Sequence, residues 1–103
     1  MIKSISFLEA TISHYGGKKG ETAKALGVGP AAISSWLKRD HVSPQAAAKC
    51  ARIVGEDESF AEAIAGAETI EDESARQTVL KMLHKAFNKS FKLARRAMKS
   101  RSR

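Results

Sequence analysis

The stretch Lys19–Lys38 carries a spacing of small and apolar residues that few packing arrangements satisfy. Gly27 lies near its centre, with Ala23 four residues before it, Ile33 six residues after it and Trp36 nine residues after it. Two helices that cross near a right angle through a short turn need a small side chain at the crossing, which Ala23 supplies. The turn also needs a residue that tolerates a left-handed backbone, which Gly27 supplies. The spacing therefore predicts a helix-turn-helix.

Proline and glycine mark most of the helix boundaries in the first 55 residues, because proline favours the first helical position and glycine the position after the last. The inward positions of the predicted helix-turn-helix are Thr22, Leu26, Val28, Ile33 and Trp36. The predicted helices run over about Ser4–Tyr15, Lys19–Leu26 and Pro30–Arg39, and from Pro44 to about Gly55. Three capping-box patterns, Ser6-x-x-Glu9, Ser59-x-x-Glu62 and Thr69-x-x-Asp72, indicate further helix starts.

Two runs within this region carry a family resemblance. The run Ala23-Lys24-Ala25-Leu26-Gly27-Val28 is followed by Ala31-Ala32-Ile33-Ser34-Ser35-Trp36, with Tyr15-Gly16-Gly17 upstream and Val42-Ser43-Pro44 downstream. This pattern resembles the Cro and λ-repressor-like helix-turn-helix family of phage and prophage regulators. The resemblance covers about residues 4–55 and does not extend to the second half of the chain.

The resemblance implies that the helix from Pro30 enters the DNA major groove as the recognition helix. Carried over by position, the groove-facing residues are Gly29, Pro30, Ala31, Ser34, Ser35 and Lys38, with Lys38 or Arg39 reaching bases or phosphates. No Asn, Gln or Arg stands early in this helix for bidentate base contacts. We therefore expect modest direct readout, with DNA shape supplying part of the specificity.

Lys18 and Lys19 lie at the predicted start of the second helix, where the helix dipole disfavours cations. Free backbone N–H groups together with two lysines are expected to form a phosphate-binding site. Two solvent-exposed lysines without a role are the alternative interpretation.

Charge falls into three blocks along the chain. Residues 1–54 hold eight basic and three acidic residues, residues 55–75 hold eight acids and no Lys or Arg, and residues 76–103 hold ten basic residues and no acidic side chain. We expect a helix-turn-helix DNA-binding domain over residues 1–55, an acidic joint with a short helix over residues 56–73, and a basic amphipathic helix over residues 74–103. Strand-like alternation is scarce, so the predicted fold class is all-α: a small helical bundle with a helix-turn-helix, followed by a long C-terminal amphipathic helix.

The last segment, about Glu71–Met98, has an apolar and a basic stripe at helical spacing. The apolar stripe is Leu80, Leu83, Phe87, Phe91, Ala94 and Met98, and the basic stripe is Lys81, Lys85, Lys89, Lys92, Arg96 and Lys99. Self-association and packing back onto the preceding helices would both bury the apolar stripe. The basic stripe fits contact with DNA phosphates, neutralisation of the acidic joint, or solubility alone.

Several classes of protein are disfavoured. No apolar run approaches the roughly 18 residues of a membrane span, and the N-terminus lacks the apolar stretch of a secretory signal. Cys50 is the only cysteine, and His14, His41 and His84 lie far apart without metal-ligand spacing. No nucleophile elbow or glycine-rich phosphate loop is visible. We therefore expect no enzyme activity, metal, cofactor, small-molecule substrate or membrane partner.

The expected function is sequence-specific binding of double-stranded DNA by a transcriptional regulator, a Cro-like repressor that blocks a promoter. We expect a homodimer or higher homo-oligomer in the cytoplasm of a bacterial host cell. A phage packaging protein such as a small terminase subunit, and a prophage antitoxin-like DNA-binding protein, are the alternatives.

Overall fold

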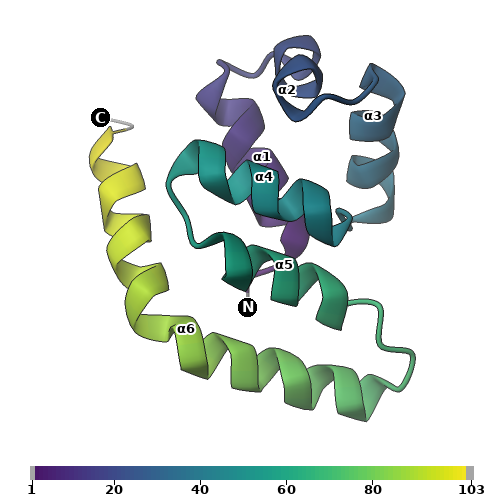
Figure 1. Cartoon of the computed structure of the whole chain (residues 1–103), viewed down its shortest axis with the longest axis vertical. Coiled ribbons are helices and arrows are strands. Elements are labelled where there is room, and N and C mark those ends of the chain that lie inside the picture. The colour runs from purple at the N-terminus through teal and green to yellow at the C-terminus, as the bar shows by residue number, and fades with distance from the viewer. Residues whose placement is uncertain (1, 102–103) are drawn as a thin grey trace.

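Six helices make up most of residues 2–101, the part of the chain that this computed structural model describes, with side chains described for residues 2–87. They are α1 (Ser4–His14), α2 (Lys19–Leu26), α3 (Pro30–Arg39), α4 (Pro44–Val54), α5 (Glu58–Ala67) and α6 (Glu73–Arg101). No strand occurs in the described residues, and the all-α prediction is confirmed. Figure 1 shows α2 and α3 at one end of the molecule and the first half of α6 along the other.

Glycine and proline set the helix boundaries that agree best with the sequence prediction. Pro30 and Pro44 occupy first helical positions. Helices α2 and α4 end at Gly27 and Gly55, with φ of +70° and +79°. Because a Cβ crowds the backbone at such angles, glycine is the residue that closes both helices at least cost.

The capping-box patterns predicted the helix starts less well. Ser6 is not the N-cap of α1 but its third residue, where its hydroxyl accepts the backbone N–H of the N-cap residue Lys3 at 3.3 Å. Asp57, rather than Ser59, caps α5 by accepting the backbone N–H three residues later at 2.8 Å. Asp72, rather than Thr69, does the same for α6 at 2.7 Å. A carboxylate also interacts favourably with the positive end of the helix dipole, which a hydroxyl does not.

Helices α1, α4 and α5 pack together to form the centre of the core. Its largest fully buried side chains include Leu8, Leu26, Ile33, Phe60 and Ile64. Alanines are buried on both sides of the α4–α5 contact, namely Ala46, Ala47 and Ala51 on α4 and Ala61 and Ala65 on α5. Small side chains allow two helices to approach closely, so this alanine-rich chain closes its core with few aromatic residues.

Helix α5 belongs to this core, although its sequence lies in the segment expected to be an acidic joint. Phe60 is buried and contacts Phe7 of α1 edge-to-face, with the ring centroids 6.2 Å apart. Ile64 is also fully buried, whereas Glu62 points to solvent. Glu62 therefore faces outward from a helix that packs with residues 1–55, whereas Glu68, which follows α5, turns inward to Ser4 and His41.

The first half of α6 packs against the bundle through part of its apolar stripe. Leu80 is buried, Leu83 and Phe87 are partly buried against the core, and the Phe87 ring lies 5.1 Å from that of Phe60. Met82 is 65% exposed. The sequence left two ways to bury the apolar stripe, self-association and packing onto the preceding helices. Residues Leu80–Phe87 pack onto the preceding helices. The predicted positions Phe91, Ala94 and Met98 lie outside the described side chains.

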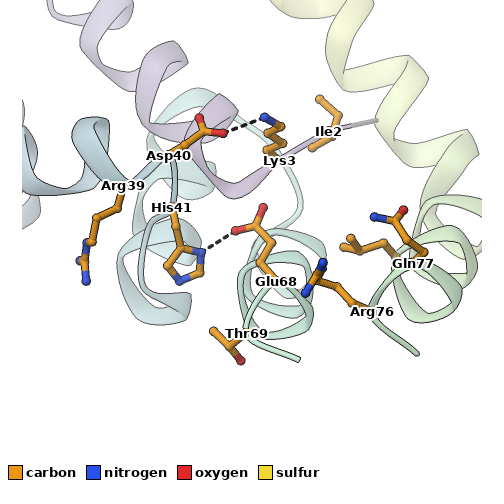
Figure 2. A pocket seen from close by; sticks show the side chains of 10 residues that line it. Ile2, Lys3, Arg39, Asp40, His41, Glu68, Thr69, Arg76 and Gln77 are labelled. Atoms are coloured by element: carbon orange, nitrogen blue, oxygen red, sulfur yellow. Dashed lines mark hydrogen bonds and ion pairs between the residues drawn. The ribbon is translucent and has the colours of Figure 1, made fainter. Parts of the chain in front are cut away.

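A polar cluster joins the chain after α3 to α1 and α5. The carboxylate of Glu68 accepts hydrogen bonds from the hydroxyl and from the backbone N–H of Ser4, the latter at 2.8 Å. It also lies 2.6 Å from Nδ1 of His41, and Figure 2 shows these two side chains pointing toward each other. The backbone N–H of Val42 donates to the Ser4 hydroxyl at 2.9 Å. The cluster therefore fixes the connection between α3 and α4.

Candidate nucleic-acid interface

The residues predicted to face inward from the helix-turn-helix are covered. Thr22, Leu26 and Ile33 have essentially no exposed surface, Trp36 is 8% exposed, and Val28 is partly buried against the core. The N–H of Val28 donates to the carbonyl of the small residue at the crossing, Ala23, at 2.9 Å and closes α2. These contacts hold α3 by one face and leave its other face free.

The free face of α3 carries most of the predicted site. Ala31, Ser34, Ser35 and Lys38 are all exposed. Their spacing of three, four and seven residues places them on one side of the helix, away from the buried Ile33 and Trp36. Three further predicted site residues are exposed at the ends of the same helix. They are the N-cap residue Gly29, the first residue Pro30 and the last residue Arg39.

The dimensions of α3 suit a DNA groove. Its ten residues correspond to a length of about 15 Å. The major groove is about 12 Å wide and admits one helix. The outward side chains at its centre are small, which allows the helix backbone to approach the bases closely.

Lys18 and Lys19 lie exposed at the start of α2. Lys18 is the N-cap residue and its side chain makes no capping hydrogen bond. The hydroxyl of Thr22 turns back to the carbonyl of Lys18 at 2.9 Å and so does not reach the first-turn N–H groups. Glu21 is the acid of this turn. The local arrangement provides the uncapped helix start and the two cations that a phosphate contact requires.

The cations of this surface keep their charge available. Within the described side chains, Lys18, Lys19, Lys38 and Arg39 form no ion pair with an acid. Asp40, which follows Arg39, pairs instead with Lys3 at 2.7 Å. The hydrogen bond to Asp40 raises the pKa of Lys3 above its ordinary value. The acid nearest the end of α3 is therefore already neutralised.

Some residues that the structure brings together were not singled out from the sequence. His41, Glu68 and Arg76 line one cavity at the end of α3, although 27 positions separate the first two. No spacing rule links such distant residues, so only the fold reveals the cluster. Among the residues with described side chains, no three His, Cys, Asp or Glu residues gather as a metal site. No described helix is long and apolar enough to cross a membrane.

Comparison with known proteins identifies no relative of this chain. No family model, no curated protein and no solved structure matches the chain. A functional interpretation must therefore be built from the arrangement of residues on α2 and α3.

Proposed function

We propose that this protein is a sequence-specific, double-stranded DNA-binding transcriptional regulator, similar to the Cro and λ-repressor-like regulators of phages and prophages. The observation that carries the proposal is the exposed face of α3, held from behind by buried Ile33 and Trp36. We place the protein on DNA in the cytoplasm of a bacterial host, where it represses transcription by covering a promoter.

Base recognition is assigned to the centre of α3. The methyl group of Ala31 contacts a thymine methyl, and the hydroxyls of Ser34 and Ser35 donate to or accept from base edges. None of these side chains makes two parallel hydrogen bonds to one base, so direct readout is modest. Sequence-dependent groove shape supplies the rest of the specificity.

Phosphate contacts are assigned to both sides of α3. Lys18 and Lys19 approach one strand together with the N–H groups that begin α2. Lys38 and Arg39 reach the backbone or bases from the other end of α3. The absence of ion pairs for these four cations in the described part of the chain supports this assignment.

Two copies of the chain would read two half-sites. Since Leu80 and Phe87 already contact the bundle of their own chain, the contact between copies is assigned to the part of α6 that follows Phe87. A homodimer or a higher homo-oligomer would then present two or more copies of α3 to DNA.

The proposal is tested by in vitro selection of bound duplexes, with light scattering on the same sample. We expect a dimer and a palindromic site whose half-site centres lie about one helical turn apart. A ring of many subunits with weak sequence preference would overturn the regulator and favour a packaging protein.

Replacing Lys18 and Lys19 by alanine tests the phosphate contacts. We expect weaker binding to all duplexes, and the slope of log K against log salt should fall by about 2. The matched control is Lys81→Ala with Lys85→Ala, which removes two exposed lysines from α6. An unchanged salt slope in the Lys18, Lys19 variant would contradict a phosphate site at the start of α2.

A further inference from the structure

A cavity of about 750 Å³ lies at the end of α3, beside the connection between α3 and α4. Its wall combines the N-terminal segment, the chain after α3, the end of α5 and the start of α6 (Figure 2). A volume of this size lies within the range that small organic ligands occupy in proteins. Of the proposed DNA-contacting residues of α3, Arg39 lines the cavity, whereas Ala31, Ser34, Ser35 and Lys38 do not.

The acids of the wall are already engaged. Asp40 pairs with Lys3 at 2.7 Å, and Glu68 lies 2.6 Å from His41 while it also accepts from Ser4. Two cations remain on the wall without an acid partner among the described side chains, namely Arg39 and Arg76. The wall therefore carries an excess of positive charge, which favours an anion.

Arg76 is the better placed of these two cations. One of its terminal nitrogens, Nη1, donates to the carbonyl of Ile70 at 2.9 Å, and the residue is partly buried. Figure 2 shows its guanidinium group turned toward Glu68, at the centre of the lining residues. This bond fixes the guanidinium group in place and leaves most of its five donors for a ligand. A fixed planar guanidinium is the group that binds a carboxylate or phosphate through two parallel hydrogen bonds.

The rest of the wall suits the body of a small molecule. Ile2 and Leu80 contribute apolar surface, and Gln77 contributes an amide beside Arg76. The second ring nitrogen of His41 remains for a further hydrogen bond, because Nδ1 is occupied by Glu68. The cavity therefore joins one fixed cation, two neutral polar groups and an apolar patch.

We propose that this cavity binds a small organic anion, whose carboxylate or phosphate pairs with Arg76 and whose apolar part contacts Ile2 and Leu80. Of the residues that line the cavity, Arg39 alone belongs to the proposed DNA interface, and anion binding through Arg76 does not depend on DNA binding. It assigns the protein a ligand site between the bundle and α6.

The test is a titration of the full chain, without DNA, with three probes of similar size, followed by amide chemical shifts. The probes are benzoate, phenyl phosphate and the neutral benzyl alcohol. We expect at least one of the two anions to bind at the cavity with a Kd of about 1 mM, and benzyl alcohol to bind much more weakly. The variant Arg76→Gln should weaken anion binding by about tenfold, the effect of losing one charged hydrogen-bonding partner.

Two further variants complete the test. Arg52→Gln removes an arginine that pairs with Glu58 on another surface, and it should leave anion binding unchanged. If Arg76→Gln does not fold, Gln77→Glu places a repelling carboxylate in the cavity and should weaken anion binding without removing Arg76. Failure of both anions to shift the cavity residues, equal binding of benzyl alcohol, or equal losses in the Arg76 and Arg52 variants would overturn the proposal.

Discussion

Replacing Phe60 by leucine tests whether α5 belongs to the cooperative unit that presents α3. Phe60 is 2% exposed and, among the described side chains, contacts the rings of Phe7, His84 and Phe87 at centroid distances of 6.2, 5.7 and 5.1 Å. These contacts link α5 to α1 and to α6. If the chain unfolds as one unit, damage at Phe60 must also lower the stability of α3.

The magnitude follows from the packing. Truncation of a buried phenylalanine to alanine costs about 3–5 kcal/mol. Leucine keeps most of the apolar volume, so the loss reduces to ring packing and imperfect fit, about 1–2 kcal/mol. With a urea m-value of about 1 kcal/mol per molar for a small domain, the unfolding midpoint should fall by about 1–2 M.

Trp36 provides the assay, because it is the only tryptophan in the chain and lies in α3. We expect its fluorescence and the far-ultraviolet circular dichroism to report the same lowered urea midpoint in Phe60→Leu. The control Ser59→Ala changes an exposed neighbour on α5 and should shift the free energy of unfolding by less than about 0.5 kcal/mol. An unchanged Trp36 transition, beside a separate loss of helicity at lower urea, would show that α5 unfolds independently of α3 and contradict the prediction.

Two further predictions concern single positions. Gly27→Ala should lower the free energy of unfolding by about 1–2 kcal/mol because of its φ of +70°, while Gly20→Ala within α2 should raise it by about 0.5 kcal/mol. No neighbouring atom crowds the added methyl group at either position, so the two variants differ in backbone angle alone. Equal changes in thermal stability in the two variants would exclude the backbone angle of Gly27 as the cause. Burial raises the pKa of the Cys50 thiol, so the native state holds this proton more tightly than the unfolded chain, and stability should fall as pH rises above about 9. The loss between pH 7 and pH 10, measured by urea unfolding, should be smaller in Cys50→Ala, and an equal loss in both proteins would exclude the thiol as its source.

The sequence predicted those parts of the fold that depend on local chemistry. Pro30 and Gly27 define helix boundaries through their own backbone geometry, whatever the rest of the chain does. The inward positions of α2 and α3, such as Ala23 and Ile33, follow from the requirements of one helix crossing another. The groove-facing residues of α3 came instead from the family resemblance, and the structure shows them exposed.

The remaining features depend on residues far apart in sequence. At the start of α1, the backbone N–H of Ser4 donates to the carboxylate of Glu68, which lies 64 positions later in the sequence. No local pattern indicates this contact. The sequence predicted an acidic joint with a short helix over residues 56–73, but this helix, which buries Phe60 and Ile64, packs against α1, far away in sequence, as well as against the preceding α4. The cavity beside Arg76 has the same origin, since its wall comes from segments at both ends of the chain.

DNA binding through α3 is tested most directly by a map of DNA contacts on the isotope-labelled chain. Amide spectra are followed while a selected duplex is added. We predict the largest shifts on the exposed face of α3, at Ala31, Ser34 and Lys38, and at the start of α2, with Glu62 on α5 unaffected. Shifts that gather on α5 or α6 and leave the amides of α3 unchanged would contradict DNA binding through α3.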